Sequence, residues 1–334
     1  MQKLIITAIL AITLISSSNI NISELTNIFN KSPYVSYNGF LKVKDSKLVN
    51  QYNREIQLKG LSSHGIQWYS DLVTYENMQY LKENWNINVF RIAMYTSENG
   101  YINNPDITKE KVIQIADNAI SLDLYVIIDW HILSDGNPNT YKEQAKEFFN
   151  EISEKYKDVP NIIYEICNEP NGNSVTWDNE IKPYAEEIIP IIRKNSPKSI
   201  IIVGTPSWSR DLDKVVNNKL EHENILYSCH FYSGSHLNEI KTKLEIALNN
   251  KLPVFVSEWG TTNYTGDGAV YPSETYELIE LLNSNNISWV NWSFCNKNEG
   301  SAILSPSYSL NSNIDENLSE SGKLVKELLL ENKN

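Results

Sequence analysis

The sequence has few cysteines that could form disulfides and few long apolar runs that could span a membrane. It contains only three cysteines, Cys167, Cys229 and Cys295, and an odd number at such wide spacing does not describe a disulfide framework. We expect buried free thiols, because each lies in or just after an expected strand. Beyond the N-terminus, no apolar run approaches the roughly 20 residues that a membrane-spanning helix needs. The chain must therefore fold around its own hydrophobic core.

Positive charge is also scarce. The 29 Lys and Arg residues are outnumbered by 41 Asp and Glu residues, which gives a net charge of -12. Polyanion binding needs clustered basic residues, so nucleic acid is excluded as a partner. No linker rich in Pro, Ser or Thr occurs, and residues 311–316 lack the duplicated calcium-loop pattern of a docking module. We therefore expect no carbohydrate-binding module and no dockerin.

The N-terminus has the pattern of a secretory signal peptide. Lys3 precedes an apolar run at 4–15, and small polar residues follow it. We expect a signal peptide at 1–20, a spacer at 21–38 and one catalytic domain at 39–334. The protein would then be secreted to the extracellular space, or to a periplasm, and would not stay on a membrane. An uncleaved anchor or a buried strand is the alternative, because no clear Ala-x-Ala cleavage site appears.

Hydrophobic periodicity predicts an α/β fold. Residues 39–59 read as a short N-terminal β-hairpin, with alternation at 40–44 and 55–58 around a turn at Asp45 and Ser46. Short β-branched runs then alternate with amphipathic helices, which implies parallel strands with helical crossovers. Eight such units favour a closed (β/α)₈ TIM barrel. We expect Pro190 to interrupt or kink its helix. The eight expected strands are 57–61, 89–93, 125–129, 162–167, 200–203, 225–230, 254–257 and 287–292.

Two carboxyl groups stand where a barrel of this type places its chemistry, at the C-terminal ends of strands. Glu169 follows the fourth expected strand and Glu258 the seventh, so both should face the barrel mouth. Cleavage of a glycosidic bond with retention needs one acid and one nucleophile, about 5 Å apart, against roughly 6.5 Å or more when a water must fit between them. Arg91 and the Tyr232 hydroxyl could both favour an ionised Glu258, which makes Glu258 the nucleophile and Glu169 the acid/base.

Several segments resemble glycoside hydrolase family 5. The motifs IIYEICNEP at 162–170 and FVSEWG at 255–260 are similar to the two signatures of that family. GLSSHGIQW at 60–68, FRIAMYT at 90–96 and DWH at 129–131 resemble its bacterial endoglucanase branch. The resemblance runs from about residue 39 to the C-terminal helix. It implies a retaining endo-β-1,4-glucanase, or cellulase, that binds β-1,4-linked glucan polysaccharide or oligosaccharide without metal or cofactor, since two carboxyls suffice for the reaction.

The resemblance also implies substrate-binding roles. Asn168 would hold the 2-hydroxyl of the sugar being cleaved, Trp292 would be its stacking floor, and Trp208 would serve the leaving side. The sequence departs from the family at 296–299, where Asn replaces the usual His before Lys297 and Glu299 replaces an Asp. The implied substrate-binding residues are His64, Trp68, Arg91, Tyr95, His131, Asn168, Trp208, His230, Tyr232, Trp292, Lys297 and Glu299.

Other readings stay open at this point. His64, His131 and His230 could be structural, or could bind zinc in a barrel metallohydrolase, although strand one lacks a His-x-His pair and no His-Glu-x-x-His motif occurs. Trp208 could be a core or lid residue. The chain could bind β-glucan without cleaving it, or transfer sugars in place of hydrolysing them. Mannan, xylan and mixed-linkage β-glucan remain competing substrates, because a fold does not fix its substrate.

Overall fold

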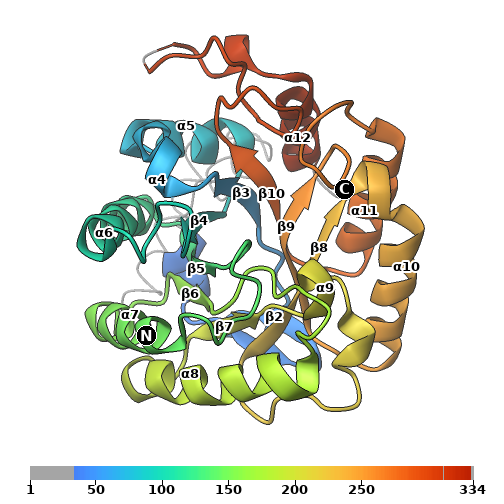
Figure 1. Ribbon diagram of the computed structural model, residues 1–334. Coiled ribbons are helices and arrows are strands. Elements are labelled where there is room, and N and C mark those ends of the chain that lie inside the picture. Colours follow the sequence, from blue (N-terminus) through green and yellow to red (C-terminus); the bar gives the residue numbers. More distant parts are fainter. Residues whose placement is uncertain (1–33, 311, 332–334) are drawn as a thin grey trace, which may run out of the picture.

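The computed structural model describes residues 34–310 and 312–331 (Figure 1). The expected signal peptide and most of the expected spacer lie outside the described residues. The last five spacer residues form helix α3, Tyr34–Asn38, whose Val35 is buried under the barrel. No helix among the described residues is long and apolar enough to cross a membrane.

Within the described residues, eight parallel strands close into a barrel in the order β10-β3-β4-β5-β6-β7-β8-β9 (Figure 1). The predicted TIM barrel is therefore confirmed. Neighbouring strands pair in parallel register, as in Val89 opposite Tyr125 and Ile163 opposite Ile200. The strands are β3 Lys59–Ser63, β4 Val89–Tyr95, β5 Tyr125–His131, β6 Ile162–Glu165, β7 Ile200–Val203, β8 Ile225–Tyr232, β9 Val254–Gly260 and β10 Trp289–Phe294.

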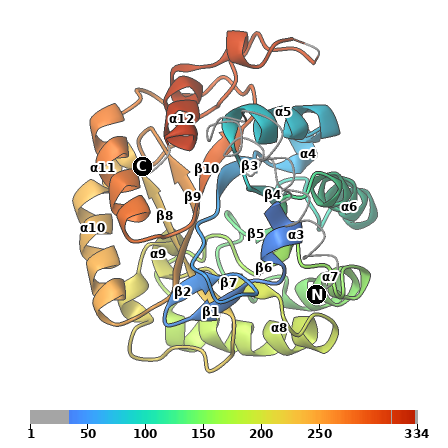
Figure 2. The same cartoon turned by 180° about the vertical axis from the view of Figure 1, so that it is seen from behind.

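Helices surround the barrel and cover its outer face (Figures 1 and 2). Each buries one apolar stripe; in α7, Phe148 and Phe149 are fully buried against Trp130 of the neighbouring strand. The helices are α4 Ile66–Tyr69, α5 Tyr75–Trp85, α6 Pro105–Ser121, α7 Lys142–Lys155, α8 Lys182–Asn195, α9 Pro206–Ser209, α10 Ser233–Asn249, α11 Pro272–Ser284 and α12 Glu320–Leu330.

One local prediction was wrong, and a second was wrong in part. The hairpin turns at Asp45 and Ser46 as expected, but its second strand is β2, Lys47–Val49, paired with β1, Lys42–Lys44, and not 55–58 (Figure 2). A two-residue turn with both residues at positive φ brings the chain straight back, so the nearer segment pairs first. Pro190 does not interrupt α8 but lies exposed inside it. The buried apolar stripe of α8 holds the helix together across the proline.

The barrel interior changes character along its axis. Its lower end is filled by apolar side chains from all around the barrel, and Leu41 and Leu48 of the hairpin close it from below. One layer higher, the inward positions carry Ser62, Arg91 and other polar residues, all buried. The apolar floor anchors the strands, while the polar layer supports whatever lies at the mouth. The apolar layer is built from Leu58, Val89, Tyr125, Ile127, Ile163, Ile200, Ile202, Leu226, Phe255 and Val290.

Candidate active site

A cleft of about 640 Å³ opens at the C-terminal ends of the barrel strands. Twelve of the fourteen predicted site residues line it, and the other two, Arg91 and Asn168, lie directly beneath, buried and bonded to each other. The structure thus brings the whole predicted set together. The lining residues from that set are His64, Trp68, Tyr95, His131, Glu169, Trp208, His230, Tyr232, Glu258, Trp292, Lys297 and Glu299.

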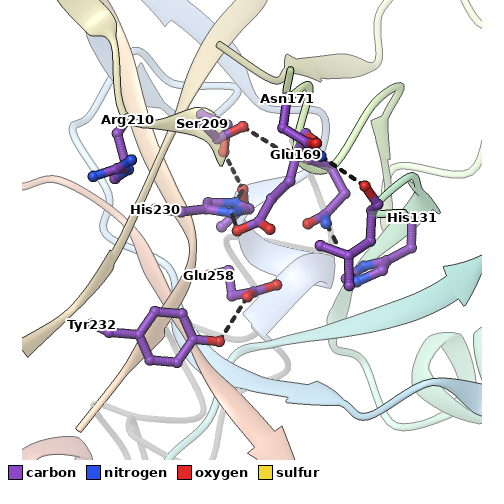
Figure 3. A network of polar contacts seen from close by, with 12 residues as sticks. His131, Glu169, Asn171, Ser209, Arg210, His230, Tyr232 and Glu258 are labelled. Carbon is purple, nitrogen blue, oxygen red and sulfur yellow. Dashed lines mark hydrogen bonds and ion pairs between the residues drawn. The ribbon is translucent and has the colours of Figure 1, made fainter. Parts of the chain in front are cut away.

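The two candidate carboxyls face each other across this cleft (Figure 3). Glu258 belongs to β9, and Glu169 follows β6 after a short turn. A carboxylate oxygen of Glu169 lies within 4.8 Å of one from Glu258. Both side chains are largely buried, yet both reach the cleft. The spacing is in the range expected of a pair that reacts with one sugar carbon directly, and is below the roughly 6.5 Å expected when an attacking water lies between one carboxyl and the sugar.

Glu258 is surrounded by hydrogen-bond donors. The Arg91 Nη1 donates to its Oε2 at 3.1 Å. The Tyr232 hydroxyl donates to its Oε1 at 3.0 Å (Figure 3). Each oxygen of the Glu258 carboxyl thus accepts from one donor, and one of the two donors carries a positive charge. The environment expected from the sequence is therefore present around Glu258.

Glu169 has a different setting. Its Oε1 lies 3.0 Å from Nδ1 of His230, with no Arg or Lys bonded to it among the described residues. Its backbone is fixed from both sides: the Asn171 amide donates to the Glu169 carbonyl at 2.8 Å, and the Ser209 hydroxyl donates to the Asn168 carbonyl at 2.6 Å (Figure 3). Glu169 thus keeps a fixed position without a bonded Arg or Lys side chain.

Arg91 organises the polar layer below the cleft. Besides Glu258, its guanidinium donates to Glu165 at 2.7 Å and to the Asn168 side-chain oxygen at 2.6 Å, and it pairs with Asp129 at 3.0 Å. Burial alone would raise the pKa of Glu165, but Arg91 and His230 together outweigh burial and lower it to about 2. A planar, five-donor group suits this role, since each edge can serve a different acceptor. Arg91 is therefore fully buried beneath the cleft, with no exposed surface for sugar.

The three clustered histidines have protein partners at their ring nitrogens. Nδ1 of His131 lies 2.6 Å from Asp129, and Nδ1 of His64 accepts from the Gly65 backbone at 2.7 Å. Both nitrogens of His230 are engaged, with Glu169 and with Ser257. Burial lowers the pKa of His64 and of His131 to about 3, so both are neutral at ordinary pH. These bonds fix the ring orientations. Among the described residues, His230 is the one histidine of the three that lies in a group close enough to share an ion, together with Glu169 and Glu258.

Exposed indole rings mark two ends of the cleft. Trp68 follows β3 and Trp208 follows β7, and these strands stand four places apart in the eight-strand closed order. The rings are 46% and 44% exposed, unlike the buried floor residue Trp292. Residues 207–209 all adopt left-handed φ near +57°, a strained conformation that displays Trp208 over the site. Exposed flat rings on opposite sides suit a chain of sugars lying across the mouth.

Lys297 and Glu299 lie together at the Trp68 side. Their ion pair measures 2.5 Å, and Lys297 also reaches His64 at 3.4 Å. Burial raises the pKa of Glu299 despite the adjacent ammonium. The Asp267 carboxylate accepts from the Gly300 backbone at 2.8 Å and so ties this segment to the neighbouring loop. The departure from the family pattern at 296–299 thus leaves a paired, partly buried polar group facing the cleft.

Some cleft residues were missed by sequence reasoning. His236 lies in the first turn of α10, where its Nδ1 accepts from the Tyr232 backbone at 3.1 Å, and burial lowers its pKa to about 4. Tyr264 protrudes from the β9–α11 loop, 70% exposed. Arg210 lies beside Trp208 and pairs with Glu239 at 3.1 Å. These residues lie in loops and in the first turn of a helix. They were missed because such segments show no hydrophobic periodicity, and because the closed barrel determines where they lie.

A closed (β/α)₈ barrel with two carboxyls facing each other at its mouth, between exposed aromatic rings, defines the class of barrel glycoside hydrolases. Comparison with known proteins assigns the family. The model of the cellulase family, glycosyl hydrolase family 5, matches residues 49–298, and the chain belongs to this family.

Individual relatives agree with this assignment. The chain is 50% identical over 292 residues to an endoglucanase of Clostridium saccharobutylicum, covering 87% of this chain and 65% of that protein. It is 53% identical over 251 residues to endoglucanase A of Evansella cellulosilytica, covering 75% of this chain and 51% of that one. The chain therefore spans between half and two thirds of these relatives' length. The catalytic domain of a Thermobifida fusca endoglucanase, solved with cellotetraose, superposes with a TM-score of 0.83 at 35% identity, covering 90% of this chain and all of that one.

Proposed function

We propose that this protein is an endo-β-1,4-glucanase that hydrolyses internal bonds of β-1,4-glucan with retention of configuration. The observation that carries the proposal is the approach of the Glu169 and Glu258 carboxylates to within 4.8 Å. A direct attack by one carboxylate on the sugar needs this spacing, whereas an inverting enzyme leaves room for water between the two groups.

The different surroundings of the two carboxyls support the assignment of roles. Glu258, which accepts hydrogen bonds from Arg91 and Tyr232, attacks the anomeric carbon while Glu169 gives its proton to the departing glycosidic oxygen. A covalent glycosyl-enzyme forms on Glu258. Glu169 then takes a proton from water as the water oxygen bonds to the anomeric carbon and the ester to Glu258 breaks. No step requires a metal or an organic cofactor.

A linear glucan is the substrate that the cleft favours. The two exposed indole rings, Trp68 and Trp208, lie on opposite sides of the mouth, so sugars on both sides of the cleaved bond can meet an aromatic surface. An open cleft admits the interior of a polymer and supports endo action. The names of the relatives as endoglucanases, and the cellotetraose bound to one structural neighbour, point to the same substrate class.

The proposal is tested by incubating the purified protein with carboxymethylcellulose, xylan and mannan, and following reducing-end release. We expect glucan cleavage with a rapid fall in viscosity, since internal bonds break first. Proton NMR of fresh cellopentaose digests should show the β-anomer before mutarotation. An initial α-anomer would contradict retention, and cleavage of xylan or mannan alone would keep the chemistry but change the substrate.

Two other outcomes would assign a different function. Products longer than the starting oligosaccharide, seen by mass spectrometry, would identify a transglycosylase, in which a sugar and not water takes the second step. Thermal stabilisation by cellooligosaccharides without any bond cleavage would identify a binding protein, because ligand binding alone stabilises the folded state.

We further propose that the protein is secreted, on the signal-peptide pattern at residues 1–20. A polymeric substrate cannot enter a cell, so an enzyme that cleaves it internally must meet it outside. Expression of the full chain in a secreting host, followed by N-terminal sequencing of the protein in the medium, tests this. An intact residue 1 on cell-retained protein would contradict it.

A further inference from the structure

Behind Glu169, a series of hydrogen bonds runs into the barrel interior. Nδ1 of His230 lies 3.0 Å from Oε1 of Glu169, and Nε2 lies 3.0 Å from Oγ of Ser257. The Ser257 hydroxyl donates to Oε1 of Glu165 at 2.6 Å, and Glu165 accepts from Nε of Arg91 at 2.7 Å. All five residues are buried. The series therefore connects Glu169 to Arg91, which donates a hydrogen bond to Glu258.

The number of available hydrogens fixes the state of the His230 ring. Ser257 has one hydroxyl hydrogen, which it gives to the ionised Glu165, so its oxygen faces His230 as an acceptor. Nε2 of His230 must then carry a hydrogen. Nδ1 is left to face Glu169, either accepting from the protonated carboxyl or donating to the ionised one. In both cases one proton occupies the line between Nδ1 and Glu169.

We propose that Ser257, oriented by Glu165, is a positioning residue that fixes the hydrogen on Nε2 of His230 and so confines the catalytic proton to the line between Nδ1 and Glu169. The proposal rests on the acid/base role given to Glu169 above. It adds that Glu169 works together with His230, whose ring can bond either protonation form of the carboxyl. A ring with its hydrogen on Nδ1 alone would donate to Glu169, favour the carboxylate and oppose proton transfer to the leaving sugar.

The charges around His230 are consistent with a shared proton. Burial acts to lower the pKa of His230, but the carboxylates of Glu165, Glu169 and Glu258 nearby together outweigh it and raise that pKa to about 9. The ring therefore takes up the proton whenever Glu169 is ionised. Several charged or titratable groups from neighbouring strands surround this site: Arg91, Asp129, His131, Glu165, Glu169 and Glu258.

Ser257→Ala tests the proposal, because it removes the acceptor for Nε2 and leaves both catalytic carboxyls in place. We expect kcat/KM on cellopentaose to fall about tenfold or more, within the range that acid/base catalysis supplies. Dinitrophenyl cellobioside, whose leaving group needs no proton, should lose much less. The basic limb of the pH profile should move to lower pH, since an imidazolium without a partner at Nε2 releases its proton more easily.

Two further variants separate positioning from simple support of the fold. Ser257→Thr keeps the hydroxyl and should restore most of the cellopentaose rate. Ser228→Ala removes the neighbouring hydroxyl, 2.7 Å from Ser257 and not bonded to His230, and should leave the pH profile in place. Equal losses on both substrates with an unmoved basic limb would show that Ser257 acts only structurally and would overturn the proposal.

A measurement without turnover provides the second test. ¹⁵N NMR of the five histidines, with His230 assigned through His230→Gln, reports which ring nitrogen carries hydrogen. We expect Nε2–H in the unmodified protein and a changed or mixed tautomer in Ser257→Ala. An Nδ1–H tautomer in the unmodified protein would overturn the proposal even if hydrolysis is confirmed. Absence of hydrolysis with an Nε2–H signal would instead reject the proposed function alone.

Discussion

Glu258 and Glu169 are buried to a similar extent, but their hydrogen-bond partners differ. Glu258 lies in a β-strand and accepts from two donors, one of them the fully buried Arg91. Glu169 lies beyond the end of β6 on a turn whose backbone carbonyls accept from the side chains of Asn171 and Ser209. The one side-chain partner of Glu169 among the described residues is a histidine that can accept or donate. One carboxyl is bonded to a fixed positive charge, and the other to a ring that can either accept or donate a hydrogen bond.

The difference follows from which strand positions support each residue. Arg91 forms ion pairs with Glu165 and Asp129 below the cleft, so these two carboxylates balance its charge and fix its position beside Glu258. A buried arginine with several acceptors loses little freedom on binding one more. Glu169 receives no such fixed charge. The same polar layer therefore supports opposite requirements at two carboxyls that approach within 4.8 Å.

The largest effect should come from Glu258→Gln. The change removes the nucleophile with little change in volume, so we expect kcat to fall by more than about 10⁴-fold while the fold and sugar binding persist. Reducing-end release from carboxymethylcellulose measures the first, and thermal stabilisation by cellotetraose the second. Glu143→Gln, at an exposed position on α7, is the matched control and should keep full activity. Near-normal activity of Glu258→Gln would remove the role given to Glu258.

Glu169→Gln should produce a loss that depends on the leaving group. General acid catalysis supplies about 10²- to 10⁴-fold, so cellopentaose cleavage should fall within that range, whereas the first step on dinitrophenyl cellobioside should fall far less. Burst kinetics on the activated substrate separate the two steps. Equal loss on both substrates would abolish the distinction drawn between the two carboxyls.

Tyr232→Phe changes the surroundings of Glu258 and leaves the hydrogen-bond partners of Glu169 in place. It removes one donor to the carboxylate, and a hydrogen bond to a charged group contributes about 1.5–3 kcal/mol, so kcat should fall about tenfold or more. The loss should be similar for activated and unactivated substrates, because Tyr232 bonds the nucleophile and not the acid. Tyr37→Phe, exposed on α3, is the control for the substitution itself. A leaving-group-dependent loss in Tyr232→Phe would contradict this assignment.

Much of the barrel could be predicted because its strands are short apolar runs with few alternatives. Residues 200–203 match β7 at both ends, but β9 continues three residues beyond its predicted end, through Glu258 to Gly260. Polar residues at the barrel mouth still pair with the neighbouring strand, so hydrophobicity underestimates strand length there. The hairpin was misplaced for the opposite reason: Lys47–Val49 is too short for an alternation pattern, and the turn geometry decides its pairing.

Site residues that belong to sequence motifs could be predicted, whereas those brought to the site only by the folded structure could not. Glu169 and Glu258 follow apolar strands and could be placed at the mouth from strand order alone. Arg91 could be assigned to the same site, but the sequence did not predict that it is buried beneath the cleft. Its burial depends on acceptors from three other strands. Tyr264 and Arg210 depend on loop conformation, which no short-range pattern encodes.

The smallest effect should come from Trp208→Ala, at the cleft end nearest Glu169. The Trp208 backbone donates to the Pro170 carbonyl at 3.0 Å, so this ring is displayed beside the acid/base turn and away from Glu258. Loss of an aromatic contact of about 1 kcal/mol should raise KM for cellopentaose about fivefold. Dinitrophenyl cellobioside places no sugar on that side, so its KM should not change. Trp208→Phe should retain part of the effect, and a KM rise shared by both substrates would move Trp208 to the other side of the cleaved bond.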